Sequence, residues 1–209
     1  MTDDHWPTDD GTAPRALSEA EGQWLLRRAR ATIEAAVRGG SAESVDPSSL
    51  PSALREPRGV FVTLTQSGCL RGCIGHIFAR EPLWQAVADA ARAAALRDPR
   101  FPPVRPEETA VLHIEVSVLT QPQPLAFASP EDLLARLRPG RDGVVLHLPH
   151  GRMATFLPQV WTQIPNKEDF LAHLAAKAGG APSDWRLPGT RIETYEVQAF
   201  EEAAQPPGV

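Results

Sequence analysis

The same order of strand and helix signals occurs twice along the chain, and this order limits the folds that it can adopt. Each half has two short apolar runs joined by a turn, then a helix, then another apolar run. In the first half these lie at 59–65, 70–77, about 82–97 and 111–119. In the second half they lie at 143–148, 152–156, 168–178 and 192–200. The pattern favours an internal duplication of hairpin, helix and strand, although two such units can resemble each other by chance.

The two copies differ at the residues that look reactive. Aligning the turn glycines, Gly68 and Gly151, places Cys73 of the first copy opposite Phe156 of the second. Arg71 then lies opposite Ala154. We therefore expect a shared scaffold with chemistry in the first half only.

A helix precedes the first hairpin. Apolar residues from 17 to 37 recur at helical spacing, and Ser18 followed by Glu21 is typical of a capping box. Residues 1–15 and 201–209 lack periodicity and are expected to be a disordered lead-in and a tail. We expect one domain at 16–200, with halves at about 58–120 and 121–200.

Charge and hydropathy exclude several functions. A net charge of -5 and a pI near 5.7 disfavour nucleic acid as a partner. The longest apolar runs are far shorter than the ~20 residues of a membrane span, and the acidic start lacks the apolar segment of a signal peptide. We expect a cytoplasmic protein with reduced thiols. Its many Arg, Ala and Pro residues favour a GC-rich bacterial source.

The segment at 70–75 carries the strongest chemical signal. Regular alternation in a strand places Cys69, Arg71 and Cys73 on one face, so the Arg71 guanidinium is expected to stabilise the Cys73 thiolate. Gly72 and Gly75 then leave the backbone open to a ligand or a partner chain. The alternative is that Cys73 is a small core residue and that the glycines serve a bulge or close packing.

Other residues are weaker candidates. Glu115 shares a strand face with Ser117 and is a possible site acid, and His76 is a possible base for Cys73. Three loop residues could bind an anion or cap turns: Arg100, Arg141 and Asp142. We expect no metal and no cofactor, because the histidines lack further ligands at suitable spacing and two cysteines are too few for an iron–sulfur cluster.

Several segments together resemble the AMMECR1 family. They are residues 70–75 (LRGCIG), 98–104 (DPRFPPV), 114–120 (IEVSVLT), 140–144 (GRDGV), 155–161 (TFLPQVW) and 177–179 (KAG). The resemblance implies an α+β fold around an antiparallel sheet with flanking helices, in two similar halves. In bacteria and archaea such proteins look like one component of the AmmeMemoRadiSam set, beside a Memo-like protein and a radical SAM enzyme. Ala175 replaces an often expected cysteine and Gly180 an expected leucine, so a second thiol from that helix is not available.

Two functions follow. In the first, the protein is a thiol-dependent enzyme or enzyme component acting on an unknown small molecule, with Cys73 as nucleophile or group carrier. Arg71 stabilises its thiolate, and Glu115 or His76 transfers a proton. In the second, the protein is a binding module without catalytic activity, and its glycine-lined strand at 70–75 receives a partner, such as the Memo-like or radical SAM protein.

Overall fold

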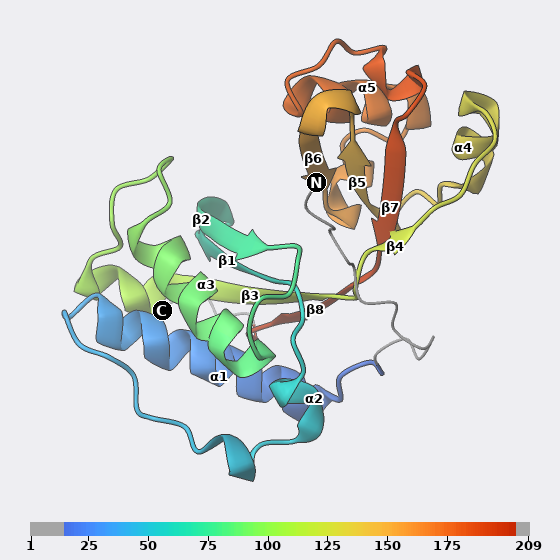
Figure 1. Ribbon diagram of the computed structural model, residues 1–209. Coiled ribbons are helices and arrows are strands. Elements are labelled where there is room, and N and C mark those ends of the chain that lie inside the picture. The colour runs from blue at the N-terminus through green and yellow to red at the C-terminus, as the bar shows by residue number, and fades with distance from the viewer. Residues whose placement is uncertain (1–14, 204–209) are drawn as a thin grey trace.

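The chain forms two lobes, each built on a four-stranded antiparallel sheet (Figure 1). The structure is a computed structural model, and it describes residues 15–203. The first lobe contains α1 (Glu19–Ala36), α2 (Ser52–Arg55), β1 (Val60–Gln66), β2 (Cys69–His76), α3 (Leu83–Leu96), β3 (Leu112–Leu119) and β8 (Val197–Glu201). The second contains β4 (Gln123–Pro124), α4 (Pro130–Arg136), β5 (Gly143–His147), β6 (Met153–Phe156), α5 (Lys167–Lys177) and β7 (Arg191–Tyr195). Short 3-10 helices lie at Pro47–Ser49, Pro106–Val111, Pro149–Gly151, Pro158–Thr162 and Asp184–Arg186.

In the first lobe, α1 and α3 cover one face of the sheet β2-β1-β3-β8 (Figure 1). Val60, Val62 and Leu64 alternate along β1 and are fully buried against these helices. The intervening residues, Phe61 and Thr63, therefore point to the other face of the sheet. That open face is the one that meets the second lobe.

The second lobe packs α5 against the sheet β4-β7-β5-β6. Its core includes Trp161 and Phe170, whose rings stack with centroids 3.6 Å apart, together with Trp185 and Leu146. Each lobe thus has its own apolar core.

The strand pairing supports the predicted duplication. The order β2-β1-β3 in the first sheet matches β6-β5-β7 in the second, and every pairing is antiparallel. Both hairpins also turn through two successive residues with positive φ: Ser67 and Gly68 in one, His150 and Gly151 in the other. Such residues match the twist of antiparallel strands, which is why glycine occupies one position in each turn.

The last predicted strand, 192–200, is in fact two strands in different sheets. The chain leaves β7 after Tyr195 and enters β8 at Val197, so it crosses from the second lobe back to the first. The second half is therefore not a continuous unit ending at residue 200.

The predicted termini fall partly outside the described residues. Of the expected lead-in at 1–15, the structure describes Arg15 alone, and residues 1–14 lie outside the described range. The predicted tail at 201–209 is wrong at its start, because Glu201 ends β8 and Glu202 pairs with Arg30 at 2.6 Å. The predicted capping box is confirmed: Ser18 and Glu21 bond to each other's backbone at the start of α1.

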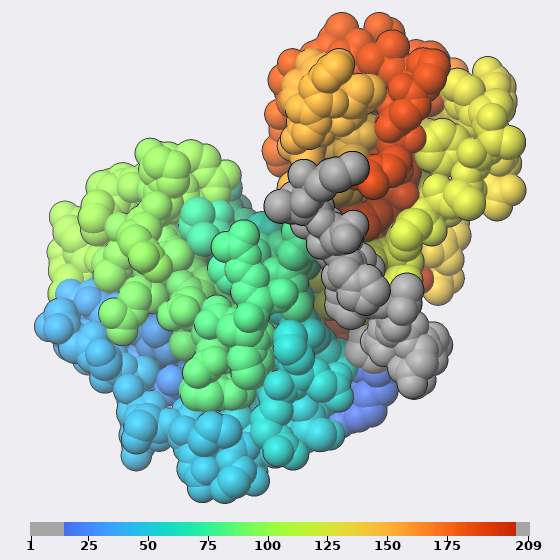
Figure 2. All heavy atoms as spheres, viewed as in Figure 1, coloured from blue at the N-terminus to red at the C-terminus, as the bar shows by residue number. Residues whose placement is uncertain are grey.

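The lobes meet through an apolar cluster beside the two segments that cross between the sheets, 120–122 between β3 and β4 and Glu196 between β7 and β8. Leu119, Val145 and Tyr195 are buried there, and Phe61 and Leu157 pack against them. The crossing segments also bond to each other, since the Thr120 amide donates to the Glu196 carbonyl at 2.9 Å. Figure 2 shows the lobes as separate masses with a hollow between them.

Candidate active site

One row of residues crosses the open face of the first sheet. Cys73 of β2 lies opposite Thr63 of β1, which lies opposite Glu115 of β3. The Thr63 hydroxyl donates to the Cys73 sulfur at 3.4 Å, so both side chains are on the same face. Phe61, two residues along the same face, belongs to the apolar cluster between the lobes. Cys73 is half-buried on this face, which borders the cleft between the lobes.

A bulge at Arg71 overturns the predicted alternation. Leu64 pairs with Gly72 but Thr65 pairs with Leu70, so Arg71 is an extra residue in β2. Cys69 consequently pairs with Gln66 and lies on the opposite face from Cys73.

The predicted role of Arg71 beside the thiolate is therefore wrong in this arrangement. Its guanidinium pairs with Glu108 at 2.9 Å and donates to the Pro102 carbonyl at 2.9 Å. Hydrogen bonding from Arg71 lowers the pKa of Glu108 to about 2, against the opposing effect of burial. These two contacts hold the segment after α3 against β2, the edge strand of the sheet.

Arg100 is the cation next to Cys73. Its Nη2 donates to the Cys73 carbonyl at 3.1 Å and to the Asp98 carboxylate at 2.7 Å. The Asp98 carboxylate also accepts the Cys73 amide at 2.9 Å. The hydrogen bond to Asp98, and to a smaller extent the neighbouring Cys73 side chain, raises the pKa of Arg100. Asp98 and Arg100 thus occupy the outer edge of β2 at Cys73, where another strand would otherwise pair.

The two glycines of the motif have packing roles. A Cβ on Gly72 would lie 2.3 Å from the Ala94 carbonyl oxygen, so glycine lets α3 approach β2. A Cβ on Gly75 would lie 2.1 Å from the Val60 carbonyl and 2.7 Å from the Phe61 ring. The prediction of an uncovered backbone is wrong for Gly72, which is buried under α3.

Glu115 and His76 lie on different faces. Glu115 is half-buried in the same row as Cys73, and its Oε1 accepts a hydrogen bond from Ser117 at 2.8 Å. His76 lies opposite Val60, hence on the helix-covered side, with Nε2 4.0 Å from Glu81. His76 is therefore not placed to act as a base for Cys73.

Arg141 and Asp142 are not part of this cleft. Asp142 is 1% exposed and accepts hydrogen bonds from Arg138, and Arg141 pairs with Glu196 at 2.7 Å. The Trp161 indole donates to the Asp142 carbonyl at 2.7 Å. These contacts stabilise the second lobe and the crossing segment.

Lys177, at the end of α5, is a charged residue of the second lobe that the strand pattern alone did not reveal. Its ammonium donates to the Thr155 carbonyl at 3.0 Å and lies 5.0 Å from the centre of the Phe156 ring. Burial among surrounding protein lowers the pKa of Lys177, and the charge of Arg100 lowers it further. The Lys177 residue as a whole is exposed. The KAG segment at 177–179 was the sequence signal that could have indicated it.

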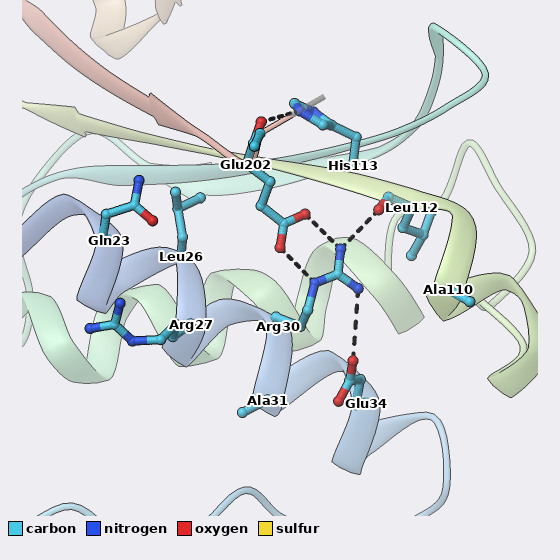
Figure 3. Close-up of a pocket in the computed structure, with 11 residues that line it drawn as sticks. Gln23, Leu26, Arg27, Arg30, Ala31, Glu34, Ala110, Leu112, His113 and Glu202 are labelled. Atoms are coloured by element: carbon cyan, nitrogen blue, oxygen red, sulfur yellow. Dashed lines mark hydrogen bonds and ion pairs between the residues drawn. The ribbon is translucent and has the colours of Figure 1, made fainter. Parts of the chain in front are cut away.

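A separate pocket between α1 and the start of β3 contains only structural contacts (Figure 3). Arg30 points into it and pairs with Glu202, while its remaining donors bind the carbonyls of Thr109 and Leu112. Within residues 15–203, no three of the His, Cys, Asp and Glu side chains gather at a possible metal site. In the same range, no helix is both long and apolar enough to cross a membrane.

The fold and the cleft define a class of two-lobed α+β protein, in which one copy of a duplicated hairpin, helix and strand unit presents a cysteine to the space between the lobes. The AMMECR1 family model matches residues 26–200, and the chain belongs to that family. It is 43% identical over 187 residues to a protein of Methanothermobacter thermautotrophicus, covering 89% of this chain and 96% of that relative. A protein of Methanosarcina acetivorans is 41% identical over 192 residues, covering 89% and 94%.

A solved structure agrees with the fold. The crystal structure of an uncharacterized protein from Pyrococcus horikoshii matches with a TM-score of 0.81 and 36% identity, covering 89% of this chain and 93% of that one. The predicted α+β fold and family are therefore confirmed. These relatives are archaeal, so the bacterial source stays a prediction.

Proposed function

We propose that this protein is a thiol-dependent enzyme or enzyme component that uses Cys73 as a nucleophile or as the carrier of a transferred group. The observation that supports this most is the position of the Cys73 sulfur. It is half-buried on the sheet face that meets the second lobe, and it accepts a hydrogen bond from Thr63. A small molecule entering the cleft would meet this sulfur beside the Arg100 guanidinium.

The neighbouring groups have distinct roles in this proposal. Arg100 stabilises the thiolate, the nucleophilic form of the side chain. Thr63 orients the sulfur through its hydroxyl. Glu115, one strand further along the row, transfers a proton at the ligand, because Thr63 separates it from Cys73 itself.

The second candidate is a binding module without catalytic activity. The edge of β2 at Cys73 is already bonded to Asp98 and Arg100, which disfavours addition of a partner strand there. A partner would instead use the cleft face. The family resemblance is what suggests Memo-like and radical SAM proteins as partners in either case.

The rate at which iodoacetamide alkylates Cys73 tests the thiol proposal. Mass spectrometry would follow the reaction across pH in a Cys69→Ser background, with the same protein unfolded in urea as the reference. We expect folded Cys73 to react at neutral pH several-fold faster than the unfolded thiol, because a cation favours the thiolate. A Cys73 that is inert only when folded would support the packing role and favour the binding module.

Once a reaction is found, Cys73→Ser separates the two candidates. The substitution should abolish activity if the sulfur is the nucleophile. Partner capture that survives Cys73→Ser, without any activity in the wild type, would support the binding module.

A further inference from the structure

We propose that the second lobe binds a short apolar peptide of about two residues, with the peptide ammonium at Glu193 and its carboxylate at Arg191. The site is a pocket of about 1340 Å³. It lies between residues 124–130, which lead from β4 into α4, and residues 185–193, which lead into β7 (Figure 1). Cys73 does not line this pocket, so the inference goes beyond the function proposed above and does not depend on it.

The polar part of the pocket belongs to the open face of the second sheet. Leu146 of β5 and Ile192 of β7 point into the core of the lobe, so the residues next to them in each strand point to the other face. These residues are His147, Arg191 and Glu193, and all three line the pocket. His147 lies directly opposite Arg191, and Glu193 is the next residue of β7 on the same face. The strand register therefore brings the three side chains together.

Glu193 is held in place and keeps one oxygen for a ligand. The His147 Nε2 group donates to the Glu193 Oε2 atom at 2.7 Å, and the two side chains are only 21% and 18% exposed. Among residues 15–203, no group donates a hydrogen bond to Oε1 of Glu193. A positioned carboxylate that is largely out of water makes strong hydrogen bonds with an ammonium group.

Arg191 supplies the complementary charge. Its residue is exposed, and within the described part of the chain its guanidinium forms no ion pair or hydrogen bond, not even with Glu193. The Cα atoms of these two residues are about 7 Å apart, because they are separated by two steps of a strand. An extended peptide spans about 3.3–3.6 Å per residue, so a dipeptide reaches from one charge to the other, whereas a single amino acid spans about half that distance.

The walls of the pocket are apolar. Leu125 and Phe127 line it from one segment, and Leu187 and Pro188 line it from the other. Leu187 is one of the few large apolar side chains that are exposed, at 42%. Phe78 of the first lobe also lines the pocket. An apolar pocket with a few convergent polar groups is typical of a small-molecule site, and these walls favour a peptide with large apolar side chains.

Calorimetric titration with the dipeptide leucyl-leucine tests this inference. Two derivatives each lack one terminal charge: N-acetyl-leucyl-leucine has no ammonium, and leucyl-leucinamide has no carboxylate. We expect each derivative to bind the wild-type protein about tenfold more weakly than the dipeptide does. Glu193→Gln should weaken binding of the dipeptide and remove the effect of N-acetylation. Arg191→Gln should likewise remove the effect of amidation.

Arg141→Gln is the matched control. Arg141 belongs to the same lobe but does not line the pocket, and it pairs with Glu196 at 2.7 Å. The substitution removes the same charge as Arg191→Gln and should leave all three affinities unchanged. Glutamine at position 193 keeps an oxygen that can accept the hydrogen bond from His147. Thermal unfolding of each variant then shows that its fold is intact before binding is compared.

The pairing of variants with derivatives decides the outcome. Saturable binding of leucyl-leucine, in which each terminal charge matters only while its own partner residue is present, supports the inference. Two results overturn it: no binding of leucyl-leucine to the wild-type protein at millimolar concentrations, or binding that Glu193→Gln and Arg191→Gln both leave unchanged. Neither result affects the function proposed for Cys73, which alkylation tests separately.

Discussion

The substitution Asp98→Asn tests the contact that holds Arg100 beside Cys73. The Oδ2 atom of Asp98 accepts the Cys73 amide at 2.9 Å and the Arg100 Nη2 at 2.7 Å, while Oδ1 accepts two further Arg100 donors. Asparagine keeps one acceptor oxygen and turns an amide donor toward the remaining donors. The substitution therefore removes two hydrogen bonds to a charged group and leaves buried donors unpaired.

The expected cost in the free energy of unfolding is about 3 kcal/mol. A hydrogen bond to a charged group contributes about 1.5–3 kcal/mol, and the lower end applies here because water screens the half-exposed Arg100. For a chain of this size, that loss lowers Tm by roughly 6–12 °C. Urea unfolding followed by tryptophan fluorescence, together with calorimetry, measures both quantities.

The pH dependence gives a second readout. Hydrogen bonding from Arg100 holds the pKa of Asp98 well below its usual range, with burial opposing the shift. A depressed folded-state pKa stabilises the protein above the unfolded value of about 4, and the gain is lost as pH falls below it, by about 1.4 kcal/mol per pH unit. The stability gap between wild type and variant should be constant from about pH 7 to 5 and should narrow below about pH 4.

Asp142→Asn provides the comparison, because Asp142 is 1% exposed and accepts hydrogen bonds from Arg138 in a similar way in the second lobe. It should destabilise the protein comparably and leave Cys73 alkylation unchanged, whereas Asp98→Asn should slow alkylation. A loss below about 0.5 kcal/mol for Asp98→Asn, or unaltered Cys73 reactivity, would refute the role assigned to this contact.

Three further predictions follow from the same contacts. Gly72→Ala should cost about 1–3 kcal/mol in urea unfolding, because its Cβ would lie 2.3 Å from the Ala94 carbonyl oxygen; a neutral result would mean that α3 can move away from β2. Arg100→Met should slow Cys73 alkylation about fivefold at neutral pH, whereas Arg71→Met should lower Tm and leave that rate within about twofold; the opposite order would restore Arg71 as the cation of the site. Glu108→Gln should destabilise the protein by about 1–2 kcal/mol at pH 7. The difference in stability should shrink as pH falls from about 4 toward 2, because Arg71 lowers the pKa of Glu108 to about 2. An unchanged difference at pH 2 would contradict this.

Much of the fold could be predicted from local signals. Ser18 with Glu21, Pro82 before α3 and Gly179 after α5 are caps whose effect depends on neighbouring backbone alone. The split between β7 and β8 could not be read in this way. Nothing local to Glu196 forces the chain to change sheets, and the crossing is fixed by partners such as Thr120 that are distant in sequence.

The candidate site was predicted in part. Cys73 and Glu115 lie on the same face of the sheet. Period-two alternation assigns a face to each residue within its own strand, and the register then relates one strand to the next. A bulge was considered only as an alternative role of the glycines, and its position was not predicted, because Arg71 is neither glycine nor proline and no local signal marks it. Because of this extra residue, Arg71 pairs with Glu108 and does not lie beside Cys73. The cation next to Cys73 is Arg100, which the sequence analysis considered only as a loop residue.

The bulge also corrects the comparison of the two copies. The row Cys73, Thr63, Glu115 in the first sheet corresponds to Thr155, Val145, Glu193 in the second, since β1 pairs with β3 as β5 pairs with β7. Cys73 therefore corresponds to Thr155 and not to Phe156, as the turn glycines alone had suggested. In the second copy the Thr155 hydroxyl bonds to Tyr195 and Val144, and Glu193 pairs with His147 at 2.7 Å. The Thr155 hydroxyl is therefore used in hydrogen bonds within the second lobe, whereas Cys73, at the same position of the first sheet, faces the cleft. This difference explains why the duplicated fold offers a single candidate thiol site.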